Sequence, residues 1–117
     1  MNKMVQIDTI KEGSITTLII NGDVDASSSI QLDESIRAAV ESCTGKLLVD
    51  CSHLNYISSA GLGVFMSYIE DLKAKEIKMV IFGLNEKVHN VFEILGLDQL
   101  LDVVVNKKEA LKLLDEA

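Results

Sequence analysis

Short apolar segments alternate with longer amphipathic ones along this chain. Residues 4–10 alternate apolar and polar side chains, which predicts a strand that is wet on one face and lies at a sheet edge. Residues 11–13 form a turn signal, and the nearly continuous apolar run at 15–21 predicts a second strand that is covered on both faces. We expect these two strands to form an antiparallel hairpin.

The remaining pattern switches between strand and helix periodicity. Buried strands are predicted at 47–50, 77–82 and 103–105, with a connecting loop at 51–55. Apolar residues at helical spacing predict helices from Leu32 to Cys43, from Ala60 to Leu72, from Val88 to Leu95 before Gly96, and after Asn106. Strands alternating with helices indicate an α/β fold with right-handed crossovers. We predict one domain over residues 1–117, a mixed but mostly parallel sheet of about five strands with an antiparallel N-terminal edge strand, and about four helices.

Composition and charge limit the cellular compartment and the kinds of partner that we expect. At 117 residues and 48% hydrophobic, the chain is long enough to bury one core, and no apolar run approaches the roughly 20 residues of a membrane-spanning helix. Cys43 and Cys51 occur without a basic and apolar leader, which favours the reducing cytoplasm and reduced thiols. The net charge of −7 disfavours nucleic acid and anionic membranes, and it suits a partner with a basic face.

The residues around Ser59 do not have the spacing of a serine hydrolase site. A hydrolase nucleophile elbow needs glycine two residues before and two residues after the serine, whereas Ser59 has Ile57 before it and Gly61 after it. His53 and His89 are the candidate bases, and nothing in the sequence brings either one to Ser59. We therefore predict that the protein is not an enzyme.

Metal and nucleotide sites are also disfavoured. Cys51 and His53 would need two further ligands at a recognisable spacing, so we predict no metal site. The segment Gly61-Leu62-Gly63 lacks the pattern of a phosphate-binding loop, and its small residues are better suited to let a helix start close to the sheet.

Two carboxylates and two serines remain as candidates for a site. Asp23 and Asp25 follow a strand and precede a serine-rich helix start, where such residues usually shape turns and caps, although they can also join a binding surface at the sheet end. Ser58 and Ser59 precede an amphipathic helix, and a capping serine contributes roughly 1 kcal/mol. A helix N-terminus also stabilises a negative group by about 0.3–1 kcal/mol, so a phosphoserine there is compatible with the fold.

The segment from Val49 to Gly63 resembles the central part of bacterial anti-sigma factor antagonists, the small single-domain members of the STAS group. The resemblance extends to Gly22-Asp23-Val24-Asp25 after the second strand, and to the third helix through Val88, Phe92 and Leu95-Gly96-Leu97. The same order of elements covers nearly the whole chain.

The resemblance implies a regulator in which the unphosphorylated protein binds a serine-kinase anti-sigma factor and releases the sigma factor. The kinase then inactivates the antagonist by phosphorylating a serine, and a phosphatase resets it. No cofactor is expected, because ATP and magnesium belong to the kinase. Alignment on Gly61-Leu62-Gly63 places the acceptor at Ser59, with Ser58 as the alternative, because many members have aspartate at the position of Ser58 and a small hydroxyl residue at that of Ala60.

The residues expected to bind the partner are Asp23, Asp25, Ser58, Ser59, Ala60, Gly61 and Leu62. The alternative function is a non-catalytic STAS interaction module of a transport or signalling assembly, in which the two serines only cap the helix. A small hydrolase that uses Ser59 is a third class, for which we expect no turnover.

Overall fold

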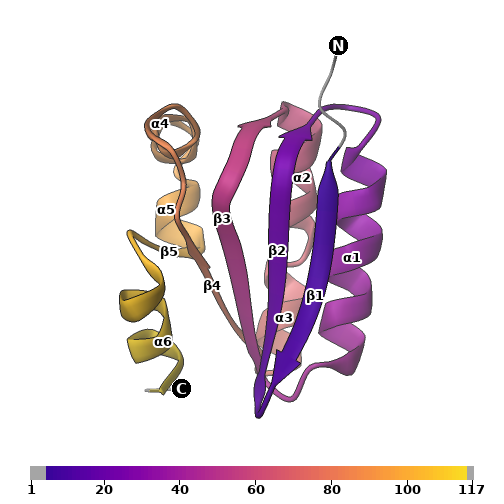
Figure 1. Ribbon diagram of the computed structural model, residues 1–117, viewed down its shortest axis with the longest axis vertical. Coiled ribbons are helices and arrows are strands. Elements are labelled where there is room, and N and C mark those ends of the chain that lie inside the picture. The colour runs from indigo at the N-terminus through magenta and orange to yellow at the C-terminus, as the bar shows by residue number, and fades with distance from the viewer. Residues whose placement is uncertain (1–4, 116–117) are drawn as a thin grey trace.

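The computed structural model describes residues 5–115 and shows a single mixed sheet with helices on both of its faces (Figure 1). The strands are β1 (Gln6–Glu12), β2 (Ile15–Val24), β3 (Lys46–Ile57), β4 (Lys78–Phe82) and β5 (Asp102–Val104), and the helices are α1 (Ser29–Ser42), α2 (Ser59–Ser67), α3 (Ile69–Ala74), α4 (Glu86–Ile94), α5 (Leu97–Leu100) and α6 (Lys107–Asp115). The strand order is β1-β2-β3-β4-β5, with β1 antiparallel to β2 and every other pair parallel. The predicted fold class is confirmed. Met4, the first residue of the predicted edge strand, lies outside the described residues.

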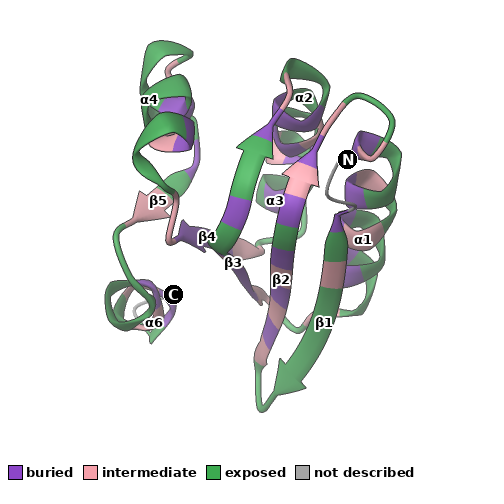
Figure 2. Cartoon of the chain, turned by 45° about the horizontal axis from the view of Figure 1, so that its top comes forward, coloured by how far each residue is buried: buried purple, intermediate pink, exposed green. Residues whose placement is uncertain are grey.

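Alternate side chains of the central strands enter two different cores. Leu47 and Val49 point to the larger core, which lies under α1 to α5, whereas Leu48 points to a smaller core under α6. Figure 2 shows that β1 is almost wholly exposed and that β2 alternates buried residues with half-buried or exposed ones, so one face of these two strands is only partly covered. The prediction that the second strand is covered on both faces is therefore only half right: residues such as Leu18 are buried, and Ile19 on the other face is half-buried.

Strand β3 is longer than the sequence pattern predicts. The predicted loop at 51–55 is wrong, because β3 continues to Ile57 and stays paired with β2 from Asn21↔His53 to Val24↔Ile57. Two register shifts interrupt this pairing, and β4 ends at Phe82 opposite Asp50. The part of β3 after Asp50 thus has one free edge and several exposed polar side chains, and for this reason its sequence resembles that of a loop.

The helix predicted from Ala60 to Leu72 is two helices, α2 and α3, which meet at Tyr68. The Tyr68 amide donates to the Phe65 carbonyl three residues back, at 3.3 Å, which makes a tighter turn than the α-helical one. The Ser67 hydroxyl donates to the Val64 carbonyl at 2.6 Å. The Tyr68 hydroxyl is held by the Asp33 carboxylate of α1 at 2.7 Å. With the short α5, which the pattern also missed, the described residues contain six helices instead of about four.

No helix between residues 5 and 115 combines the length and the apolar character that crossing a bilayer requires.

Candidate functional site

The carboxyl ends of β2 and β3 lie side by side and bring the candidate residues together. Asp23 pairs with Tyr56 and Val24 with Ile57, and directly after them the Ser58 amide donates to the Val24 carbonyl at 2.7 Å. The loop into α1 and the turn into α2 therefore start from adjacent points at one end of the sheet. This juxtaposition follows from the parallel pairing, which puts the carboxyl ends of neighbouring strands on the same edge.

Ser58 is the N-cap of α2 and is held by its own hydrogen bonds. Its backbone is extended at φ −79° and ψ 169°, and its hydroxyl oxygen accepts from the Gly61 amide at 3.2 Å. Its carbonyl accepts from the Leu62 amide at 3.0 Å. The side chain is half-buried and faces the first turn of the helix, so its oxygen is already used in the fold.

The variant Ser58→Ala should lower the free energy of unfolding by about 1 kcal/mol, because it removes the side-chain acceptor of the Gly61 amide. Thermal or urea denaturation followed by circular dichroism measures this change. The matched control is Ser59→Ala, which alters an exposed side chain and should stay within about 0.5 kcal/mol of the wild type. Equal losses in the two variants would contradict the capping role of Ser58.

Ser59 differs from Ser58 in both exposure and bonding. It is the first residue of α2, its side chain is exposed, and its hydroxyl makes no hydrogen bond within residues 5–115. The Ser59 and Ala60 amides also have no acceptor in this part of the chain, as expected for the first turn of a helix. An exposed hydroxyl therefore stands next to two free backbone donors and the positive end of the helix.

Gly61 and Leu62 lie beneath this surface and support it. A side-chain carbon at Gly61 would lie 2.7 Å from Ile57 Cγ1 and 2.8 Å from Val24 Cγ1, so only glycine lets α2 begin this close to the sheet. Leu62 is 3% exposed and belongs to the larger core. Gly63 meets nothing within 4 Å, so the close approach expected for the two glycines holds for Gly61 alone.

Asp25 organises the loop between β2 and α1. Its carboxylate accepts from the Ser28 amide at 2.8 Å, from the Ser28 hydroxyl at 2.9 Å and from the Ser27 hydroxyl at 2.8 Å. These donors, with the Ser28 amide first, hold the pKa of Asp25 below its ordinary value of 3.8. The predicted turn role is therefore confirmed for Asp25, whereas the N-cap of α1 is Ser28, which makes no side-chain cap bond.

The lowered pKa of Asp25 makes a testable contribution to acid stability. In the unfolded chain this carboxyl keeps its ordinary pKa, so its ionised form stabilises the fold above that value, and the contribution is lost as pH falls through the lower folded pKa. Asp25→Asn should therefore flatten the decline of unfolding free energy between about pH 5 and pH 2. Urea titrations across this range measure it, and Ser27→Ala, which removes one donor, should produce part of the effect. An unchanged slope in Asp25→Asn would show that these bonds do not act on the carboxyl.

Two asparagines and a tyrosine belong to the same end of the sheet, and the sequence prediction missed them. The Asn55 amide group donates to Asp23 Oδ1 at 3.0 Å, and that of Asn85 donates to the Asn55 carbonyl at 3.2 Å. Asn85 also caps α4 by accepting from the Val88 amide at 2.9 Å. Tyr56 is 51% exposed beside them. A polar residue that follows a parallel strand is the signal that could have indicated Asn85, whereas Asn55 lies inside β3, in the segment predicted as a loop.

The other chemistry-bearing side chains do not assemble. Cys51 is buried, which raises the pKa of its thiol, whereas His53, two residues later, is exposed. The Ser52 hydroxyl donates to the Asp50 carboxylate. Across residues 5–115, histidine, cysteine and carboxylate side chains form no group of three that could hold a metal ion.

Comparison with known proteins identifies the family of this chain. Residues 6–110 match the STAS domain family. The anti-sigma-B factor antagonist of Listeria monocytogenes is 27% identical over 86 residues, which cover 74% of this chain and 75% of that protein. An anti-sigma factor antagonist from Mycobacterium paratuberculosis superposes with a TM-score of 0.87 at 17% identity, covering 96% of this chain and 95% of that one. The phosphorylated form of the Bacillus cell fate determinant SpoIIAA superposes with a TM-score of 0.67 at 16% identity, covering 93% of this chain and 97% of that one. These names describe antagonists, which agrees with the prediction of a protein that is not an enzyme.

Proposed function

The chain belongs to the STAS domain family, and we propose that it is an anti-sigma factor antagonist controlled by phosphorylation of Ser59. In this proposal the unphosphorylated protein binds a serine-kinase anti-sigma factor in the cytoplasm and frees the sigma factor that the kinase holds. The kinase supplies ATP and magnesium, and a phosphatase removes the phosphate. The names of the relatives support the antagonist role, and the SpoIIAA structure is an example of a phosphorylated protein with this fold.

The observation that carries the choice of residue is the difference between the two serines. Ser58 uses its oxygen to cap α2, whereas Ser59 is exposed and its hydroxyl is unbonded within residues 5–115. A kinase must bring the acceptor oxygen to the γ-phosphate, and only the Ser59 oxygen can reach it without breaking the helix cap. This argument supports Ser59 over Ser58.

The surroundings explain how one phosphate could change the binding of a partner without unfolding the protein. The positive end of α2 and the free amides of Ser59 and Ala60 can hold the added charge of about −1.5 to −2. The same charge would be added beside Asp23 and Asp25, at the surface that the partner has to cover. Phosphorylation would therefore preserve the fold and oppose the complex.

Reconstitution with the cognate kinase and its sigma factor tests this function. Unphosphorylated protein should displace the sigma factor from the kinase in a gel-filtration or calorimetric competition, and protein that was first phosphorylated by the kinase should not. Tyr56→Ala alters an exposed side chain at the same end of the sheet and reports whether the contact extends beyond the α2 turn. A kinase that binds neither form of the protein would refute the proposal.

A further inference from the structure

A second surface, formed by α4 and α5, carries an unusual share of exposed apolar side chains. Among the described residues nine large hydrophobics are exposed, and four of them fall in the ten-residue stretch 91–100, which runs from α4 into α5: Val91, Ile94, Leu95 and Leu100. We call these four residues the α4–α5 corner. Ile94 is 82% exposed, the highest value among the nine. Scattered exposed hydrophobics are ordinary, but a cluster of this kind marks an interaction surface.

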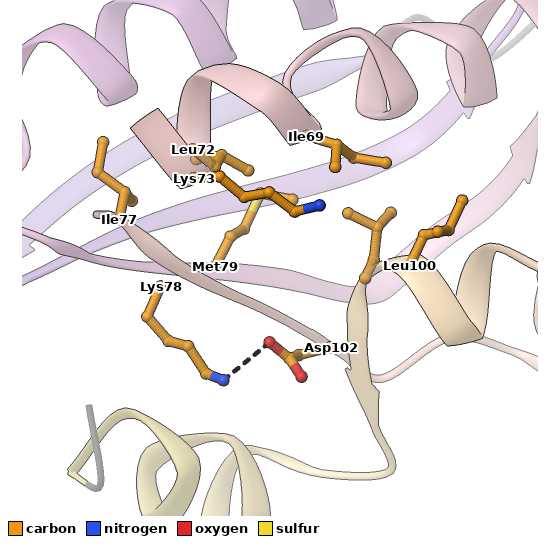
Figure 3. Close-up of a pocket in the computed structure, with 9 residues that line it drawn as sticks. Ile69, Leu72, Lys73, Ile77, Lys78, Met79, Leu100 and Asp102 are labelled. Atoms are coloured by element: carbon orange, nitrogen blue, oxygen red, sulfur yellow. Dashed lines mark ion pairs between the residues drawn. The ribbon is translucent and has the colours of Figure 1, made fainter. Parts of the chain in front are cut away.

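A groove lies directly beside this corner, between α3 and α5 (Figure 3). Ile69, Leu72, Met79, Leu100 and Leu101 supply its apolar walls, and its volume is about 170 Å³. An apolar cavity of about 150 Å³ accommodates a benzene-sized group, so the groove has room for one large side chain. We call it the α3–α5 groove. Leu100 belongs to both features, so the corner and the groove form one continuous surface.

The charges of the groove and the corner are opposite. Lys78 is neutralised by Asp102 at 3.0 Å, whereas Lys73 runs along the groove toward Ile69 and has no ion pair within residues 5–115 (Figure 3). The corner carries Glu93, which faces His89 at 2.8 Å, and Asp98, which has no ion pair in the described part of the chain. The groove therefore suits an apolar side chain with a carboxylate beside it. The α4–α5 corner of a second copy offers both, in Ile94 and Asp98.

We propose that the protein forms a symmetric dimer in which Ile94 of each copy enters the α3–α5 groove of the other copy. A two-fold interface uses the same patch on both subunits, and this patch contains both the protruding side chain and the hollow that can receive it. In this arrangement Asp98 of one copy approaches Lys73 of the other, because Glu93 already faces His89. Burying Ile94 supplies apolar contact, and the charge pair fixes the register of the interface.

The groove that receives Ile94 does not include the phosphorylation site. Ile77 and Lys78, at the amino end of β4, line the groove, whereas Ser59 follows the carboxyl end of β3. The α3–α5 groove and Ser59 therefore lie at opposite ends of the parallel strands. The dimer proposal does not rest on the proposed function and can be tested separately from it.

Sedimentation equilibrium over protein concentrations from about 10 µM to 1 mM tests the dimer. A salt concentration of about 0.15 M restricts charge effects to about 8 Å, so the net charge of −7 on each copy contributes little at long range. The mass should rise from 12.8 kDa toward twice that value. Ile94→Lys should raise the dissociation constant at least about tenfold, whereas Val105→Lys, at a 77% exposed apolar residue after β5, should leave it unchanged.

Charge reversal tests the register. Lys73→Glu should weaken the dimer, and combining it with Asp98→Lys should restore the dissociation constant to within a few-fold of the wild type. A wild-type protein that stays at 12.8 kDa at every concentration would overturn the proposal, as would equal dimerisation of Ile94→Lys and Val105→Lys. If the wild type is monomeric and Ile94→Lys instead weakens kinase binding, the corner belongs to the partner interface and the dimer is refuted.

Discussion

Replacing Gly61 by alanine should lower the free energy of unfolding by about 1–3 kcal/mol, although alanine is the better helix former. The added carbon would lie 2.7 Å from Ile57 and 2.8 Å from Val24, which are both buried, so neither side chain can move away without disturbing the core. The first turn of α2 must then shift outward and carry Ser59 with it. Urea denaturation measures the loss of stability, and the initial rate of phosphorylation reports the displacement of Ser59.

Gly63→Ala is the matched control for this change. Gly63 lies on the same helix two residues later, and a side-chain carbon there meets nothing within 4 Å. The control should therefore raise the free energy of unfolding by about 0.5–1 kcal/mol through helix propensity. If both alanine variants shift stability in the same direction, the close approach of α2 to the sheet is not what requires glycine at position 61.

Ser59→Asp should weaken binding to the serine-kinase anti-sigma factor on the order of 10- to 100-fold. Aspartate places a permanent charge at the exposed first residue of α2, near Asp23 and Asp25, and an unfavourable charge in a protein interface costs up to several kcal/mol. Each 1.4 kcal/mol corresponds to a factor of ten in affinity. Isothermal titration calorimetry against the kinase measures the change.

Ser59→Asn separates the effect of charge from that of size, since its side chain has nearly the same shape as aspartate. The asparagine variant should bind within a few-fold of the wild type. Unfolding curves of both variants should match that of the wild type, because Ser59 is exposed and its hydroxyl makes no hydrogen bond within residues 5–115. Equal loss of affinity in the aspartate and asparagine variants would point to shape and not to charge.

Hydrophobic periodicity predicted most of the fold because the side chains of the central strands are buried in one core or alternate between the two cores. It failed where burial is one-sided. The segment 51–55 mixes polar residues with the buried Cys51 and Leu54 and shows no regular alternation. Its strand conformation depends on pairing with β2, since β4 does not reach its other edge, and this is a property of the assembled sheet. The break at Tyr68 likewise depends on a tertiary contact, since the Tyr68 hydroxyl reaches Asp33 on α1.

The site was partly predictable for a related reason. Parallel topology alone brings the segments after β2 and β3 together, so Asp23, Asp25 and the two serines could be assigned to one end of the sheet. The different roles of Ser58 and Ser59 required the helix start, because only the structure shows which hydroxyl accepts from the Gly61 amide. Asn85 contributes from the loop after β4, and its contact with Asn55 joins segments 30 residues apart.

Peptide mapping by mass spectrometry after incubation with the cognate kinase and ATP tests the central claim most directly. The wild type and Ser58→Ala should each carry one phosphate on Ser59, and Ser59→Ala should carry none. The Ser58 variant separates the two roles, because it weakens the cap of α2 and keeps the exposed acceptor. Phosphate on Ser58 in the wild type, or incorporation into Ser59→Ala, would contradict the assignment of Ser59 as the switch.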